Sequence, residues 1–162
     1  MPLSPNKKGR RFEDQIQRVL GDLQGAYPQL VSVTKQVRLV LYNGQEVVPD
    51  FQLHIRFLHE IGYYLIECQH RRRSSASIVH KIRSVKSLSK HNTFIYLYHS
   101  RISMALLSAL EADGVMSMAF KDFVVFVREL KVSLHLICKV RKPIERRMTH
   151  YHHVSKRRNI TS

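Results

Sequence analysis

The sequence predicts an α/β fold, in which helices flank a mixed β-sheet and a basic C-terminal extension follows. The first observation is the length, because 162 residues suffice for one domain and are too few for two full cores. The second is the hydrophobic content of 44%, which is enough to bury a core. The third is the alternation of helix-type and strand-type apolar patterns. We expect one domain over residues 1–138 and a basic, histidine-rich tail over residues 139–162.

The first half of the chain is expected to form one helix and three strands. In residues 8–25, apolar side chains recur at spacings of three and four, which is typical of an amphipathic helix. Residues 30–42 are rich in β-branched and aliphatic side chains and end at an Asn-Gly turn, so a strand leading into a hairpin is expected. Residues 47–57 alternate cleanly between apolar and polar, and residues 63–69 form the next strand after a turn.

The second half alternates between helices and short strands. Residues 77–90 carry an apolar stripe with basic residues opposite it, which predicts a helix. Residues 93–98 are wholly apolar and predict a buried strand. A helix over residues 103–113 is stopped by a glycine, a weak strand follows over 115–119, and a helix over 121–130 is expected last. The order is therefore α-β-β-β-α-β-α-β-α, and the basic remainder is expected to be irregular.

The positive charge is concentrated in three blocks. The formal net charge is +15: residues 1–12, 70–101 and 130–162 carry +4, +8 and +8, and the remaining segments together carry −5. Most of the acidic residues lie between these blocks, and seven of the twelve fall within residues 13–69. A polyanion is the expected partner, nucleic acid before any anionic surface. Carboxylates directly before the most basic internal block suggest acids held beside a phosphate-binding surface.

The chain shows no signal for a membrane or an oxidising compartment. It contains no run of about 18 apolar residues, so no membrane span and no membrane partner are expected. The basic N-terminus lacks the apolar segment of a secretory signal. Cys68 and Cys138 are too few for a disulfide framework and show no metal-ligand spacing. We expect a cytoplasmic protein associated with nucleic acid.

Two carboxylates are expected to share one face of the central hairpin. If the turn is centred between residues 59 and 60, Asp50 pairs with Gln69 and Glu67 pairs with Gln52. The two acids are then diagonal neighbours, roughly 7–8 Å apart, and a single Mg²⁺ can lie between them. The opposite face of both strands is apolar, so the face with the carboxylates is expected to be left for solvent or ligand.

These residues resemble the PD-(D/E)XK nuclease superfamily. The resemblance rests on Val48-Pro49-Asp50 and on the Ile-Glu-Cys-Gln run at 66–69, with an acidic helix before them and a basic helix after them. It covers residues 8–100, with an extension to residue 130 as the alternative, and implies a restriction-endonuclease-like αβββαβ core in a nuclease-like domain over residues 1–138. It further implies Mg²⁺-dependent hydrolysis of phosphodiester bonds in DNA, with Mn²⁺ as a substitute ion.

The resemblance assigns roles to several side chains. Asp50 and Glu67 match the two metal-binding acids, and the main-chain carbonyl of Cys68 is a further ligand in such sites. Glu13 resembles the first-helix acid that often joins the metal site. The alternative for Glu13 is a simple electrostatic partner of the helix N-terminus.

The motif departs from the family at one position. Gln69 occupies the usual lysine position, and this E-x-Q form occurs in some restriction enzymes. In other members the lysine moves to the following helix, where Lys81 is the nearest candidate and Arg83 and Lys86 are alternatives. The expected catalytic residues are therefore Asp50, Glu67, Gln69 and Lys81, with Gln69 orienting a water.

The block after the motif is expected to grip DNA. Its expected nucleic-acid-binding residues are Arg71, Arg72, Arg73, Arg83, Lys86 and Lys90. The function expected is a Mg²⁺-dependent DNA endonuclease, with restriction, homing or mobile-element, repair and junction-resolving subtypes all open. A homodimer is expected because a double-strand break needs two active sites. The alternatives are a non-catalytic basic nucleic-acid-binding protein on the same fold, or a binder of structured RNA in which the acids are structural.

Overall fold

The computed structural model describes most of the chain, namely residues 5–40, 44, 46–57, 61–69, 75–86, 92–99 and 101–158. Its centre is a five-stranded sheet of order β1-β4-β5-β6-β7. The strands are β1 (Val31–Lys35), β4 (Phe51–Arg56), β5 (Ile61–Cys68), β6 (Asn92–Tyr98) and β7 (Met116–Ala119). The first three strands pair antiparallel and the last three pair parallel, so the sheet is mixed. The expected α/β fold is confirmed.

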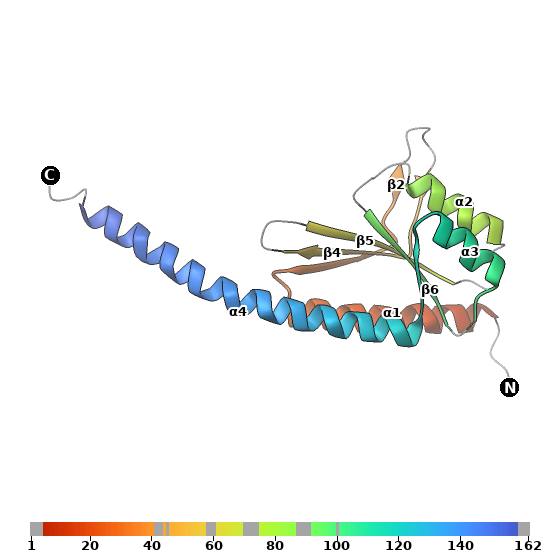
Figure 1. Ribbon diagram of the computed structural model, residues 1–162, viewed down its shortest axis with the longest axis horizontal. Coiled ribbons are helices and arrows are strands. Elements are labelled where there is room, and N and C mark those ends of the chain that lie inside the picture. Colours follow the sequence, from red (N-terminus) through yellow and green to blue (C-terminus); the bar gives the residue numbers. More distant parts are fainter. Residues whose placement is uncertain are drawn as a thin grey trace.

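Four helices cover the two faces of this sheet (Figure 1). They are α1 (Pro5–Ala26), α2 (Ser75–Lys86), α3 (Met104–Ala112) and α4 (Phe120–Arg158). Parallel strands need crossover connections, and α2 links β5 to β6 while α3 links β6 to β7. The helices α1 and α4 lie together below the sheet, whereas α2 and α3 lie on its other side (Figure 1).

The sheet therefore has an apolar core on each side. The first core joins α1 and α4 to the sheet through fully buried side chains such as Leu20, Phe51 and Phe123. The second core lies under α2 and α3 and includes Leu65 and the fully buried Tyr96. Leu65 lies on the same face of β5 as Glu67, so the expectation that this face is left to solvent is wrong for the part under α2.

Two expected strands are each broken into two pieces. The segment expected over 30–42 forms β1 and then β2 (Leu39–Val40), with Gln36 at a positive φ of 52° between them. The segment expected over 47–57 forms β3 (Glu46–Val47) and β4, separated at Pro49, which cannot donate a ladder hydrogen bond. The pieces β2 and β3 pair with each other in a small separate sheet.

The last helix is far longer than expected. Instead of ending at residue 130, α4 continues to Arg158, so the tail expected to be irregular from residue 139 is helical to that point. Leu134 is fully buried in the first core, and the Tyr27 hydroxyl donates to the Lys131 carbonyl at 3.0 Å, so packing against α1 extends the helix. Beyond this contact α4 projects past the sheet (Figure 1). In the described part of the chain, no helix has the length and apolar character needed to cross a membrane.

Candidate active site

The two motif acids lie at the end of the β4–β5 pair, in a register different from the expected one. Phe51 pairs with Ile66, whereas the expected pairing of Gln52 with Glu67 is displaced by two residues. Continuing the observed register by one position places Asp50 opposite Glu67. Because the displacement is an even number of residues, each residue of the ladder keeps the face that alternation predicts.

Asp50 is buried at the entrance to β4. Its side chain is held by the backbone N–H of Cys68, which donates to Oδ2 at 2.7 Å. The residue retains 8% of its exposed surface, so this charge-assisted hydrogen bond acts in a largely water-excluded place. Pro49 has no N–H and cannot donate to the neighbouring strand, and the Asp50 carboxylate accepts the N–H of Cys68 at the end of β5. The bond fixes the carboxylate at the junction of β4 and β5.

Glu67 forms an ion pair with Lys81 of α2. The Lys81 Nζ atom lies 2.5 Å from Glu67 Oε2 and donates a second hydrogen bond to the Val48 carbonyl at 2.7 Å. The side chains of Lys81 and Glu67 are only 19% and 8% exposed. One ammonium therefore connects β5, α2 and the segment before β4. The sequence patterns did not predict the Val48 carbonyl at the site. The signal that could have indicated it is Pro49, which interrupts the hydrogen-bond ladder of the strand directly after Val48.

Apolar side chains surround this ion pair. A cavity of about 10 Å³ adjoins it, lined by Pro49, Leu65, Ile66, Glu67, Lys81, Ile82 and Phe94. Such a volume is about that of one water probe. The apolar lining lowers the local dielectric constant, so the interaction between the ammonium and the carboxylate is stronger than at an open surface.

The structure distinguishes the three basic candidates on α2. Lys81 contacts Glu67, whereas Arg83 pairs through Nε with Asp113 Oδ2 at 2.8 Å and is 61% exposed. The helix ends at Lys86, whose side chain lies outside the described part of the structure. The geometry thus joins Lys81 to Glu67 and directs Arg83 toward the C-terminus of α3.

Gln69 takes a different direction from the one expected. Its backbone N–H donates to the Leu97 carbonyl at 2.7 Å, and its side-chain amide donates to the Arg101 carbonyl at 3.1 Å. Among the described hydrogen bonds, none joins Gln69 to Asp50 or Lys81. The amide therefore ties β5 to the segment before α3, and the positive charge at the site comes from another element.

Three carboxylates act on the thiol of Cys68. Burial raises the pKa of Cys68 well above its ordinary value, and the charges of Asp50, Glu67 and Glu13 raise this pKa further. The thiol stays protonated, so the main-chain carbonyl is the group of Cys68 suited to a hard cation. Glu13 also lies 4.0 Å from the Lys35 ammonium, with its own side chain 15% exposed. The first-helix acid thus reaches the neighbourhood of the two motif acids.

The donor set suits a magnesium ion. Mg²⁺ is held by one or two carboxylates together with water and substrate phosphates, and it prefers hard oxygen donors. Asp50 and Glu67 supply two such carboxylates, and the Cys68 carbonyl is the third oxygen that the motif provides. Among the described residues, no group of three or more His, Cys, Asp or Glu side chains is arranged to hold a metal. An ion held by Asp50, Glu67 and the Cys68 carbonyl would take its remaining ligands from water and phosphate.

The remaining predicted DNA-binding residues lie outside the described part of the chain. They are Arg71, Arg72, Arg73 and Lys90. Their contribution to binding stays a prediction.

Comparison with known proteins adds neither a family nor an activity. No protein-family model and no curated protein matches the chain. A solved structure, "Crystal Structure of Protein of Unknown Function AF1548", is similar with a TM-score of 0.47 and 12% sequence identity. The similarity covers 67% of this chain and 56% of that one, so this chain spans little more than half of that protein's length.

Proposed function

We propose that the protein is a Mg²⁺-dependent DNA endonuclease of the PD-(D/E)XK type. The observation that carries the proposal is the contact of Lys81 with Glu67, beside Asp50, at the end of the β4–β5 pair. A lysine from α2 then supplies the charge that Gln69, at the motif position, lacks. The restriction-endonuclease-like core is part of this proposal, since it explains why an acid pair, a basic helix and a mixed sheet occur in this order.

Each side chain has a distinct task in the proposed reaction. Asp50 and Glu67, with the Cys68 carbonyl, would hold the ion, which supplies Lewis-acid polarisation of the phosphate and lowers the pKa of a bound water. The Cys68 N–H keeps the Asp50 carboxylate oriented. Lys81 keeps Glu67 in place and puts a positive charge where negative charge develops on the phosphate. Preorganisation of these charges in an apolar surrounding makes them more effective than in water.

Affinity for the substrate is expected to come from the excess of basic residues. A net charge of +15 favours any polyanion, and neutralising phosphates releases counterions. Binding should therefore weaken steeply as salt rises, with little dependence on base sequence from these contacts alone.

A plasmid assay tests the catalytic proposal. Supercoiled DNA is incubated with the protein in Mg²⁺ or in EDTA, and nicked and linear products are separated on a gel. We expect nicking in Mg²⁺ that is lost in Asp50→Ala and in Glu67→Ala. Glu46→Ala is the matched control, because it removes one carboxylate that is 55% exposed and pairs with Arg38 at the surface. Cleavage that survives in both site variants would contradict the proposal.

A non-catalytic nucleic-acid-binding protein on the same fold is the second candidate. It is favoured by Gln69 at the lysine position and by the ion pair itself, since Lys81 can neutralise Glu67 as a structural element without a metal. Tight DNA binding with no nicking by the wild type would support this candidate over the enzyme. Preferential retention of folded RNA over duplex DNA at matched salt would indicate that the polyanion is RNA.

A homodimer is part of the enzymatic proposal, because cutting both strands needs two sites. An apolar stripe on the outer side of α4 supports it, consisting of Val125, Val132, Leu136 and Val140, which are 47–60% exposed. Light scattering of the wild type should give the mass of a dimer, and Leu136→Glu should give that of a monomer. A wild-type protein that stays monomeric at working concentrations would contradict this part.

A further inference from the structure

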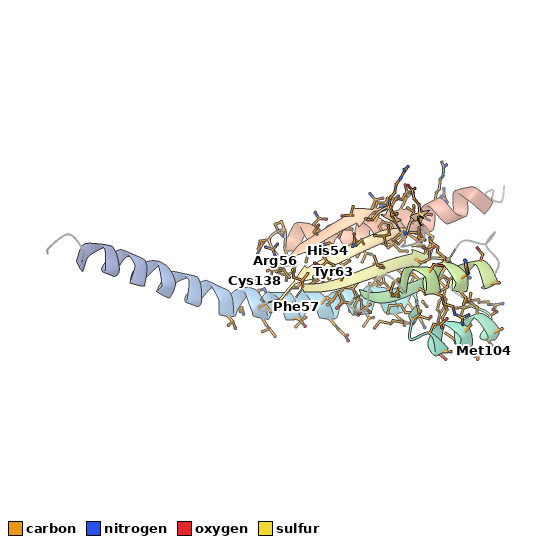
Figure 2. All side chains as sticks on the ribbon, turned by 90° about the horizontal axis from the view of Figure 1, so that it is seen from above. His54, Arg56, Phe57, Tyr63, Met104 and Cys138 are labelled. Atoms are coloured by element: carbon orange, nitrogen blue, oxygen red, sulfur yellow. The ribbon has the colours of Figure 1, made fainter. Side chains whose placement is uncertain are left out.

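On the second sheet face, the described helices α2 and α3 cover only the half formed by the end of β5 with β6 and β7 (Figure 1). The second core contains Val47, Leu65, Phe94 and Tyr96 from the strands, and no described residue of β1 or β4 belongs to it. Figure 2 shows His54 and Tyr63 on the part of the β4–β5 hairpin that lies away from α2 and α3. We call this surface the open face. Its residues are Ser32, Thr34, Gln52, His54, Arg56, Ile61 and Tyr63.

The strand register makes the open face continuous. His54 lies opposite Ser32 on one side and opposite Tyr63 on the other, and Arg56 lies opposite Ile61. All of these side chains are exposed or half-buried. Since facing residues of neighbouring strands lie about 5 Å apart, they form a single surface across three strands.

The chemistry of the open face suits unpaired nucleic acid. None of its residues is acidic, Arg56 is a cation, and the face also carries hydroxyl and amide side chains, all of which are groups that contact phosphate and sugar. The rings of His54 and Tyr63 contact edge to face, with their centroids 4.4 Å apart. Desolvation lowers the pKa of His54, so near neutral pH it presents an uncharged aromatic ring. Aromatic rings on an open sheet stack with bases of single strands, whereas a duplex keeps its bases inside.

The open face also leads to the candidate active site. Asp50, Gln52 and His54 lie on one face at the start of β4, so Asp50 is about 13 Å from His54 at 3.3 Å per residue. Gln52 between them is half-buried, whereas Leu65 on β5 is buried under α2. The only large apolar side chain on the open face is Ile61, 51% exposed, which is little for a protein partner whose interface core must be apolar. A nucleic-acid strand is therefore the occupant that the surface fits best.

We propose that the open face binds a single-stranded segment of nucleic acid and directs it toward Asp50 and Glu67. This inference rests on the proposed nuclease function and specifies its substrate as one with an unpaired segment next to the cleavage point. Arg56 contacts phosphate, and Tyr63 with His54 stacks on bases.

Fluorescence anisotropy in EDTA tests the inference without requiring cleavage. Labelled 20-nucleotide DNA and RNA single strands and a DNA duplex of the same sequence are titrated at one salt concentration. We expect Tyr63→Leu to weaken single-strand binding by about 5- to 150-fold, the range for one stacked base. Tyr63→Phe should retain affinity because it keeps the ring. Whichever single strand binds more tightly identifies the natural sugar.

Arg56→Gln provides a second variant that keeps the fold, because Arg56 is an exposed side chain. Its matched control is Arg38→Gln, an exposed cation away from the open face. Arg56→Gln should lower single-strand affinity more than Arg38→Gln does. The inference would be overturned if Arg56→Gln and Arg38→Gln had equal effects and Tyr63→Leu bound single strands as the wild type does. It would also be overturned if the variants lost affinity for the duplex alone. Because these titrations are made in EDTA and require no cleavage, failure of the nuclease proposal remains distinguishable from failure of this inference.

Discussion

Replacing Lys81 by methionine should destabilise the fold, because it removes the ammonium while keeping most of the side-chain volume. The change deletes two hydrogen bonds, to Glu67 Oε2 and to the Val48 carbonyl. Breaking a buried ion pair from one side costs about 3–5 kcal/mol, since the other charge stays in a desolvated place. Lys81 is 19% exposed, so the lower end applies, about 3 kcal/mol. For a domain of this size that corresponds to a fall in Tm of about 6–12 °C.

Urea unfolding followed by far-UV circular dichroism at pH 7 measures this loss. The control is Arg83→Met on the same helix, where the ion pair with Asp113 involves a cation that is 61% exposed. A surface pair of this kind contributes about 0–1 kcal/mol. Both variants remove a cation from α2. The difference between their free energies of unfolding therefore measures the effect of the desolvated environment of Lys81.

A double variant tests the physical cause. Glu67→Gln combined with Lys81→Met removes the carboxylate charge that the single variant leaves behind. The double variant should therefore be more stable than Lys81→Met by about 1–3 kcal/mol, the coupling expected for groups in direct contact. If Lys81→Met costs no more than Arg83→Met, or if Glu67→Gln recovers nothing, the ion pair does not have the role inferred from its burial.

Three further predictions concern the rest of the chain. Phe123→Ala should cost about 3–5 kcal/mol in chemical denaturation, because Phe123 is fully buried between α4 and the sheet; Val125→Ala, 47% exposed on the same helix, should cost under about 1 kcal/mol. Cys68, 1% exposed and with a raised pKa, should resist iodoacetamide at pH 8 and react once urea is added, as seen by mass spectrometry. The pKa of His54 lies below its ordinary value of 6.5, so the unfolded state binds its proton first as the pH falls. The free energy of unfolding should therefore decrease as the pH is lowered from about 6.5, and the part of this decrease that His54 causes should be absent in His54→Gln. An unchanged pH dependence in that variant would contradict a lowered pKa of His54.

Alternation along the hairpin strands predicted faces but could not predict partners. Phe51 and Ile66 belong to the first core as their apolar character indicates, and the carboxylate of Glu67 lies on the opposite face. A slide of two residues leaves every face unchanged, so the sequence pattern could not exclude it. Register depends on the turn and on contacts such as the bond from the Cys68 N–H to Asp50.

The choice among the basic residues of α2 depended on the rotation of the helix. Ile78 and Ile82 are buried in the second core, and this fixes Lys81 beside Glu67 while Arg83 faces α3. The spacing of the apolar residues of α2 was visible in the sequence. The sequence did not show which residue of the sheet would lie beside Lys81, at the edge of this apolar face. The length of α4 was missed because few described residues beyond residue 130 are buried: Leu134 is fully buried, and Ile137 and Cys138 are partly buried against the first core.

The most direct test of the catalytic claim is single-turnover cleavage at saturating protein, with binding measured in the same samples. A labelled DNA with a single-stranded segment beside a duplex is mixed with excess protein and then with Mg²⁺. The wild type should cleave, and Asp50→Asn should bind equally well but cleave at least about 100-fold more slowly. Glu46→Gln should match the wild type in both measurements. Equal cleavage by Asp50→Asn and the wild type, or saturated binding without any cleavage, would contradict the assignment of Asp50, Glu67 and Lys81 to a nuclease active site.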